Sequence, residues 1–422
     1  MPDVNRRAIA AGAVGNALEW YDFAVFGFFA PVISTQFFPA DDPLAGLINT
    51  FGVFAAGYLM RPIGGFLFGH LGDRLGRRRA LLISIVAMAV PTSLIAVLPT
   101  HEQVGALAAL LLVILRLAQG VSVGGEFIGS ITYLVEMATP GRRAYFGSWS
   151  VFSTVLGMLA GSAVAALLHL ILTSEQMADF GWRLPFLGGV VIGVVGVWLR
   201  LHLRETPSFQ ELQTSARVAV WPLGDAIRQM PFRMVQMAAM VMLLGVGIYV
   251  LFIWMPTYLT HIVSPTVPGA LTINTLAMVV LVALMPVAGL VADRVGYKPV
   301  LAAAMLVAAI VVYPLFLWVD TGALIAVIIA QLVFAIFSGF LQGATPVAMV
   351  EQFPARLRYS AMATGYNLTI AIFGGTAPLV ATWLVQATGD LAAPAWYLAA
   401  VAVISLIATL TLKRRTDLEW DT

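Results

Sequence analysis

GHLGDRLGRRRALL, residues 69–82, is a basic, glycine-rich stretch between two long apolar runs. It has a counterpart later in the chain, GLVADRVGYKPVLA at 289–302, where Asp293 stands in the place of Asp73. In both places the stretch directly follows an apolar run long enough to be a buried helix. The similarity suggests that the chain contains two related halves.

A second pair of segments supports this duplication. YLVEMATPGRR (133–143) corresponds to AMVEQFPARLR (348–358), and Glu136 is matched by Glu351. The two pairs occur in the same order and at nearly the same offset, which argues against a chance match. Two duplicated halves are typical of transporters whose substrate site lies between the halves, near the middle of the membrane.

The composition is that of an integral membrane protein. Of 422 residues, 60% are hydrophobic and only 10% are charged, with a mean hydropathy of +0.92. A soluble domain usually carries about 25% charged residues. The chain has no cysteine, which excludes disulfides and thiolate metal sites. The net charge of +2 is spread over many short loops and does not indicate a nucleic-acid partner.

We predict an all-α fold with two pseudo-symmetric bundles of six membrane-spanning helices. Each apolar run is long enough for a helix of roughly 20 residues to cross the bilayer. The bundles are residues 1–203 and 231–422, joined by a middle loop at 204–230. The twelve expected spans are 8–37, 44–69, 80–98, 104–135, 144–172, 183–203, 232–260, 269–291, 299–319, 321–350, 360–387 and 393–412.

The basic residues predict the orientation of these spans. If the helices alternate in direction, nearly all of the 23 Lys and Arg residues fall on one side of the membrane. Arg183 lies on the other side, and Arg61 and Arg116 lie within spans. Because short basic loops remain in the cytoplasm, we expect both termini there and the chain in the inner membrane. Loops this short leave no room for a catalytic domain, so we do not expect an enzyme.

The loop pattern G-x-x-x-D-R-x-G-R-R at 69–78 resembles the signature of the major facilitator superfamily. More narrowly, the chain is similar to the metabolite:proton symporter family, whose members carry citrate, 2-oxoglutarate, shikimate, and proline or betaine. The segments that carry this resemblance are GNALEWYDFAVFGFFAP (15–31), RPIGGFLFGHLGDRLGRRRAL (61–81), RLAQGVSVGGEF (116–127), EMATPGRRAYFGSW (136–149) and YNLTIAIFGGTAPLVATWL (366–384). The resemblance implies substrate import by alternating access, driven by a proton gradient and without a cofactor. We also expect a monomer.

Charged side chains inside the predicted spans are the strongest functional signal, because such residues are costly in a bilayer and are functional by default. In the first helix Asn16, Glu19 and Asp22 follow one another at intervals of about 60° and form one stripe. The resemblance implies that the first, fourth, seventh and tenth helices line the central cavity. The charged residues concerned are Glu19, Asp22, Glu126, Arg61 and Arg116.

We expect Arg116 to bind a substrate carboxylate, since its planar guanidinium suits that group. Arg61 could bind a second carboxylate or pair with an acid of the first helix. A carboxylate that gains and loses an arginine partner could take up and release a proton. The proton-coupling candidates are therefore Glu19, Asp22 and Glu126, and the substrate-binding candidates are Arg116, Arg61, Gln119, Asn16, Tyr21, Gln342, Tyr366 and Asn367. The structural alternative is that these charges only pair and fix the packing of helices.

Charged residues at the cytoplasmic ends of the helices are candidates for a gate. Asp73 is expected to face the positive N-terminal end of the eleventh helix. The alternative is that the arginines only fix the orientation in the membrane. The gating candidates are Asp73, Arg74, Arg77, Glu136, Arg142, Asp293, Glu351 and Arg358.

The main functional hypothesis is a proton symporter that imports a small organic acid, such as a di- or tricarboxylate. The alternative is a proton symporter of a zwitterionic osmolyte such as proline or betaine, with a cation–π cage formed by Trp20, Tyr21, Tyr249 and Trp254. A membrane sensor without transport activity and a drug exporter are weaker alternatives. The partners expected are the substrate, protons and the lipid bilayer.

Overall fold

The computed structural model describes residues 16–17, 19–65, 67, 77–122, 126–136, 138–139, 141–201, 222–263, 266–353 and 355–412. Regular structure in this part of the chain is helical throughout. In the first half, residues 19–28 form a helix that continues through a turn at Phe29 into α2. The elements of this half are α2 (Ala30–Phe37), α3 (Pro43–Leu59), α5 (Arg77–Ala96), α6 (His101–Val104), α7 (Ala106–Ser122), α8 (Glu126–Glu136), α9 (Arg143–Ile171), α10 (Ser174–Asp179), η1 (Gly181–Arg183) and α11 (Leu184–Leu201).

The second half begins after the middle loop and contains three π-helical segments, η2, η3 and η4, within its membrane helices. Such segments are rare and occur frequently at functional sites. The elements of this half are α13 (Pro222–Gln229), α14 (Pro231–Ile248), η2 (Tyr249–Trp254), α15 (Met255–Thr257), η3 (Tyr258–Ile262), α16 (Ala270–Val295), α17 (Tyr297–Val319), α18 (Leu324–Val350), α19 (Ala355–Thr369), η4 (Ile370–Gly374), α20 (Ala377–Thr388) and α21 (Ala393–Leu410).

The predicted spans correspond to helices, and the prediction of an all-α membrane fold is confirmed. Within the described residues, nine helices are long and apolar enough to cross a membrane. The first, third and sixth predicted spans are represented by the helix ending at Phe37, by α5 and by α11. Within the described residues 222–230 of the predicted middle loop, the structure has a short helix, α13, which starts at Pro222 as helices commonly do.

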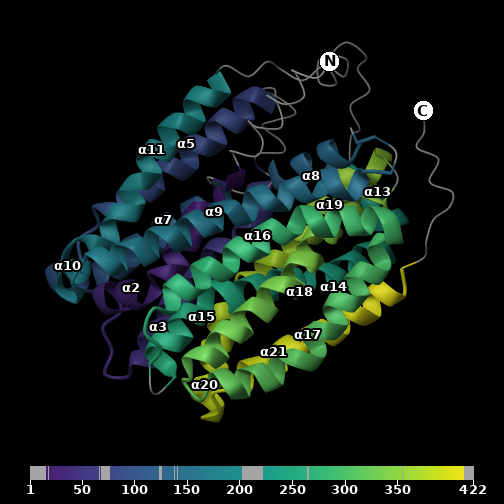
Figure 1. Ribbon diagram of the computed structural model, residues 1–422. Coiled ribbons are helices and arrows are strands. Elements are labelled where there is room, and N and C mark those ends of the chain that lie inside the picture. Colours follow the sequence, from purple (N-terminus) through teal and green to yellow (C-terminus); the bar gives the residue numbers. More distant parts are fainter. Residues whose placement is uncertain are drawn as a thin grey trace.

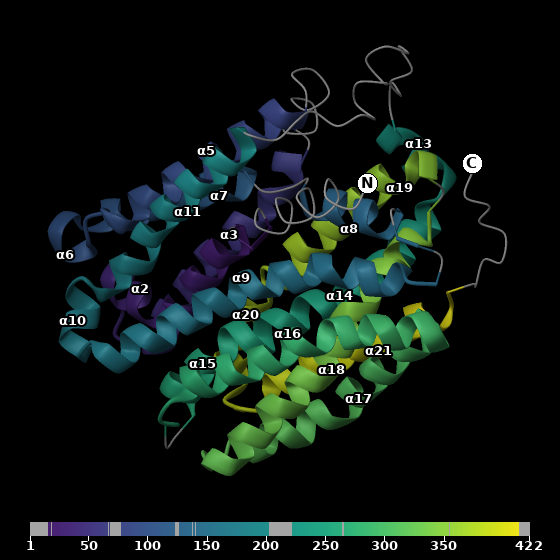
Figure 2. The ribbon, with the colours of Figure 1, turned by 45° about the horizontal axis from the view of Figure 1, so that its top comes forward.

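The helices form two groups that meet along α9 and α16. In the first group α5 packs on α11 and α7, and α3 packs on α7. In the second group α18 packs on α16 and α17, and α21 packs on α14 and α17. Figures 1 and 2 show α9 of the first group lying beside α16 of the second group.

Glycines allow α3 and α7 to approach each other closely. A Cβ atom added to Gly120 of α7 would overlap the carbonyl group of Gly57 on α3. A Cβ atom at Gly57 would in turn lie 3.1 Å from the carbonyl oxygen of Arg116. Small residues at such contacts are the usual means by which membrane helices pack closely. This contact fixes Arg116 next to α3, which also carries Tyr58.

Gly120→Ala is therefore expected to lower the free energy of unfolding by about 1–3 kcal/mol, because the added methyl group must separate two backbones. The matched control is Gly52→Ala, since Gly52 is also helical and has no atom within 4 Å of an added Cβ. Thermal unfolding of both variants in detergent checks the prediction. Equal unfolding midpoints for the two variants would contradict it.

Candidate functional site

Five aromatic side chains from both groups of helices meet near the centre of the molecule. Trp20, Tyr58 and Phe127 come from the first group, and Tyr249 and Tyr366 come from the second. The ring centroids are 6.4 Å apart for Trp20–Tyr249, 6.2 Å for Trp20–Phe127, 5.0 Å for Phe127–Tyr366 and 5.2 Å for Tyr58–Tyr249. The Tyr249 hydroxyl also donates a hydrogen bond of 2.6 Å to the Tyr58 hydroxyl. We call these five residues the aromatic cluster; all are buried.

Arg61 lies at the edge of the aromatic cluster and pairs with Glu19. Its Nη2 atom is 3.3 Å from Glu19 Oε1, and its side chain is 1% exposed. The guanidinium carbon is 5.0 Å from the Trp20 ring centroid and 5.4 Å from that of Tyr58. In the described part of the chain, Arg61 Nε and Nη1 and Trp20 Nε1 have no hydrogen-bond partner. Buried donors without a partner are rare in proteins, so these three are available to a ligand or to water.

Arg116 is also compensated by an acid of the first helix, but through an intervening amide. Arg116 Nη1 donates to Gln119 Oε1 at 2.7 Å, and Gln119 Nε2 donates to Asp22 Oδ2 at 2.6 Å. Gln119 Nε2 also donates to Thr92 Oγ1 at 2.8 Å. The guanidinium carbon of Arg116 lies 4.3 Å from the ring centroid of Phe26. Arg116 and Asp22 therefore belong to one hydrogen-bonded chain within the first group of helices, while Arg116 Nε and Nη2 have no hydrogen-bond partner in the part of the chain that the structure describes.

Three of the predicted substrate-binding residues belong to these two arrangements: Arg61, Arg116 and Gln119. Tyr366 belongs to the aromatic cluster. Tyr21 points away from the cluster, because its hydroxyl donates to the carbonyl oxygen of Pro185 on α11 at 3.3 Å.

Three further candidates lie elsewhere in the sequence. Gln342 is buried on α18 and Asn367 is buried on α19. Glu126 is the first residue of α8, and the position of its side chain is not among the described atoms.

Two members of the aromatic cluster, Tyr58 and Phe127, were not among the residues singled out in the sequence. A signal for Tyr58 was present, since it precedes Arg61 by three residues and side chains at that spacing share a helix face. The predicted cation–π cage contained Trp20 and Tyr249, which are in the cluster. It also contained Trp254, whose indole donates instead to Thr382 Oγ1 at 2.8 Å.

The two groups of helices touch at both ends of the α9–α16 contact. At one end Asp293 accepts hydrogen bonds from the backbone N–H groups of Ala144 at 2.8 Å and Tyr145 at 3.0 Å. At the other end Ser162 Oγ lies 2.8 Å from Thr275 Oγ1. Asp293 therefore caps the first turn of α9, where an acid is favoured by the helix dipole.

The other gating candidates are only partly described. Asp73 and Arg74 lie outside the described residues, and nothing is described of the side chains of Arg77 and Glu136. The contact expected of Asp73 is made in the other half by its counterpart Asp293. Arg142 is exposed at the start of α9, and Arg358 donates from Nε to the carbonyl oxygens of Val350 and Phe353 at 3.1 Å.

Glu351, at the end of α18, is near α9 of the other group. Burial raises the pKa of the Glu351 carboxyl, and the charge of Arg143 opposes that rise. Tyr297 donates a hydrogen bond to the same carboxyl. Since Arg143 is the first residue of α9, this end of the molecule has a second electrostatic contact between the groups.

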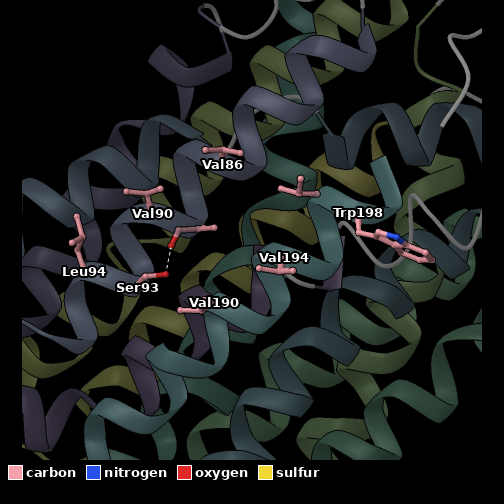
Figure 3. Close-up of a pocket in the computed structure, with 9 residues that line it drawn as sticks. Val86, Val90, Ser93, Leu94, Val190, Val194 and Trp198 are labelled. Carbon is pink, nitrogen blue, oxygen red and sulfur yellow. Dashed lines mark hydrogen bonds between the residues drawn. The ribbon is translucent and has the colours of Figure 1, made fainter. Parts of the chain in front are cut away.

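A separate groove between α5 and α11 is apolar (Figure 3). Its volume is about 520 Å³, and its lining includes no charged side chain. Ser93 is hydrogen-bonded to the carbonyl oxygen of Ala89 at 2.7 Å. This groove therefore offers no partner for a charged substrate, unlike the central site. It is lined by Val86, Ala89, Val90, Ser93, Leu94, Val190, Val194, Val197 and Trp198.

Family models match both halves of the sequence. The model described as sugar (and other) transporter matches residues 8–219, and that described as Major Facilitator Superfamily matches residues 260–421. Among curated relatives, the proline/betaine transporter of Escherichia coli (strain K12) is 32% identical over 424 residues, covering 98% of this chain and 84% of the relative. The ectoine/proline transporter ProP of Corynebacterium glutamicum is 36% identical over 430 residues, covering 97% and 84%.

Solved structures share the fold at low sequence identity. A structure of the proton:xylose symporter XylE bound to 6-bromo-6-deoxy-D-glucose superposes with a TM-score of 0.75 at 19% identity, covering 95% of this chain and 94% of that one. The human organic anion transporter MFSD10 gives a TM-score of 0.66 at 15% identity, covering 96% and 99%. At these identities the similarity concerns the fold alone.

Proposed function

The chain belongs to the major facilitator superfamily, and from this premise we propose that it imports a zwitterionic osmolyte of the proline or betaine type together with a proton. As a member it is a multi-pass membrane transporter and not an enzyme. Its curated relatives are named as transporters of proline, betaine and ectoine. These names support the zwitterion better than the organic acid that we expected first from the sequence.

The charges of the central site favour the same substrate. Glu19 and Asp22 already compensate Arg61 and Arg116. A di- or tricarboxylate would bring two or three negative charges to a site with no uncompensated cation among these four residues, and buried charge without a partner is strongly disfavoured. A zwitterion adds no net charge. The pairing of the two arginines is thus the main reason to prefer it.

One end of the site suits a single carboxylate, and the other suits an ammonium group. Within the described residues, the buried donors without a hydrogen-bond partner include Arg61 Nε and Nη1, Trp20 Nε1, and Arg116 Nε and Nη2. We assign the substrate carboxylate to those of Arg61 and Trp20, because Arg61 lies against the aromatic cluster. The substrate ammonium would lie against the rings of Tyr249, Tyr366 and the rest of the aromatic cluster, which attract cations through their π faces. These unpartnered donors beside the aromatic cluster assign the two ends of the substrate, while the pairing of the two arginines carries the proposal.

The Arg61–Glu19 pair supplies a means of coupling to protons. A substrate carboxylate that binds Arg61 competes with Glu19 for the same guanidinium. Glu19 displaced from Arg61 is a buried carboxylate that has lost its arginine, and a proton from the outside would neutralise it. Substrate and proton would then favour each other's binding. Release of both toward the cytoplasm would restore the Arg61–Glu19 pair.

Ligand-dependent unfolding tests the substrate class. A ligand that binds the folded protein raises its unfolding temperature by mass action. We expect glycine betaine and proline to raise the unfolding temperature of the purified chain, and citrate and 2-oxoglutarate to leave it unchanged. Stabilisation by citrate but not by glycine betaine would refute the proposed substrate.

The contacts at the start of α9 are proposed as the cytoplasmic gate. Alternating access requires the contacts on one side to break while those on the other side hold. Asp293 and Glu351 connect the two groups at the end that the basic loops predict to be cytoplasmic. Opening toward the cytoplasm would separate Asp293 from α9.

Asp293→Ala is therefore expected to favour the state open to the cytoplasm. Loss of a helix cap costs about 1 kcal/mol, which shifts the equilibrium roughly fivefold. Because the chain has no cysteine, Ser148→Cys provides a single probe in the α9–α16 contact, where Ser148 is buried. Its labelling by a maleimide from the cytoplasmic side should be faster in the Asp293→Ala background. An unchanged labelling rate would contradict this role, and Asp293→Asn, which keeps one acceptor, should have a smaller effect.

A further inference from the structure

A row of polar side chains begins one helical turn before Glu19. Asn16 precedes Glu19 by three residues, which is about 4.5 Å along a helix. Asn16 Nδ2 donates to Ser130 Oγ of α8 at 3.0 Å and to Ser153 Oγ of α9 at 3.5 Å. Three helices therefore contribute polar groups to one place, and Asn16 is only 1% exposed.

The row continues along α9 toward its first residue. Ser150 precedes Ser153 by three residues and is also buried. Gly157 of α9 is in close contact with the carbonyl group of Ala17, so this face of α9 packs against the first helix. Ser150 precedes Gly157 by seven residues, nearly two full turns, and lies on the same face. We call Asn16, Ser130, Ser150 and Ser153 the polar row.

Two atoms of the polar row lack partners. Within the described residues, Asn16 Oδ1 and Ser150 Oγ form no hydrogen bond although both are buried. The neighbouring hydroxyls cannot supply the missing donor, because Ser130 Oγ donates to the carbonyl oxygen of Phe127 at 2.8 Å and Ser153 Oγ to that of Ser150 at 2.7 Å. Leaving polar atoms unpaired in an interior is costly, and buried water is what usually pairs with them.

We propose that the polar row holds buried water that carries the proton from Glu19 toward the N-terminal end of α9, the end facing the cytoplasm. This inference rests on the proposed proton coupling and adds the route by which the proton leaves. The row starts beside the proposed proton carrier and follows α9 in the direction of Asp293. Its two unpartnered atoms lie at its two ends, Asn16 Oδ1 near Glu19 and Ser150 Oγ nearer the start of α9.

The transfer needs no other reactant. The protonated Glu19 gives its proton to the adjacent water, and that water passes one of its own protons to the next water held by the row. The oxygens of the row accept hydrogen bonds from these waters and position them. Each step breaks one O–H bond and forms one. Glu19 returns to the carboxylate form and can pair again with Arg61, while the proton leaves at the far end.

Ser150→Ala tests the route most cleanly, because the Ser150 hydroxyl makes no hydrogen bond within the described protein and its removal should not weaken the fold. Two measurements in proteoliposomes are compared: accumulation of labelled glycine betaine driven by a proton gradient, and exchange of labelled for unlabelled glycine betaine without a gradient. We expect accumulation to fall roughly tenfold, as expected for the loss of one hydrogen-bonded step, while exchange stays near the wild-type rate. Ser153→Ala should act in the same way, and Ser150→Thr, which keeps a hydroxyl, should restore accumulation.

Ser405→Ala is the matched control, because Ser405 is a buried serine of the other group whose hydroxyl donates to the carbonyl oxygen of Ala239 at 2.8 Å. It should leave the ratio of accumulation to exchange unchanged. Wild-type ratios in both Ser150→Ala and Ser153→Ala would overturn the route, as would an equal loss in Ser405→Ala. If the wild-type chain itself accumulates substrate without a proton gradient, the proposed coupling fails instead, so the two failures are distinct.

Discussion

Arg61→Met is expected to lower the rate of glycine betaine uptake by roughly a hundredfold or more. The substitution removes the guanidinium that we assign to the substrate carboxylate, and truncating one member of a buried, hydrogen-bonded charge pair costs about 2–5 kcal/mol. It also leaves Glu19 without the partner that lies 3.3 Å away. Uptake into proteoliposomes at equal amounts of reconstituted protein provides the measurement.

The double variant Arg61→Met with Glu19→Gln separates binding from folding. It removes both charges, so no lone buried carboxylate remains and the folded state should recover most of its stability. Transport should not recover, because the carboxylate site is still missing. Arg61→Lys keeps the charge but lacks the planar fork, and should retain partial uptake. Wild-type uptake by the double variant would show that the pair only fixes helix packing.

Arg116→Met is expected to have its largest effect on stability. Arg116 and Asp22 are joined through Gln119 by hydrogen bonds, and removing the cation leaves Asp22 as a buried charge without compensation. The loss of unfolding free energy should be about 3–5 kcal/mol. Thermal unfolding of the purified variant is the measurement.

The combination of Arg116→Met with Asp22→Asn provides the control for this prediction. If the two residues compensate each other, the double variant should be more stable than the Arg116→Met single variant, and the two single losses should not add. Groups in one hydrogen-bonded network usually show such coupling. Simple addition of the two losses would mean that Gln119 does not connect them.

The all-α membrane fold could be predicted from the sequence, because long apolar runs are local signals. The charged residues of the site could also be found, since Glu19, Asp22, Arg61 and Arg116 stand out in apolar surroundings. A pair between Arg61 and an acid of the first helix was one of the two roles expected for Arg61, and the structure shows it with Glu19. The link from Arg116 to Asp22 through Gln119 could not be predicted. Whether Arg116 binds a substrate or an internal acid depends on the rotation of two helices about their axes, which the sequence does not specify.

The partners that the structure gives to Arg61 and Arg116 changed the expected substrate. Two arginines within membrane spans favour a di- or tricarboxylate in the sequence, where pairing with an acid of the first helix is only the alternative. The structure pairs Arg61 with Glu19 directly and Arg116 with Asp22 through Gln119. Aromatic residues were equally ambiguous, because Tyr21 and Trp254 look like cage residues in the sequence but are hydrogen-bonded to Pro185 and Thr382. Tyr58 and Phe127 join the cluster only through contacts between distant segments.

We propose that a site with two compensated arginines takes up a zwitterion with a proton. The most direct test is proteoliposome flux with an internal pH-sensitive dye and an imposed substrate gradient, compared for glycine betaine and 2-oxoglutarate. We expect an inward gradient of glycine betaine to acidify the lumen and a protonophore to abolish its accumulation, while 2-oxoglutarate has no effect. Acidification by 2-oxoglutarate, with none by glycine betaine, would contradict this mode of transport.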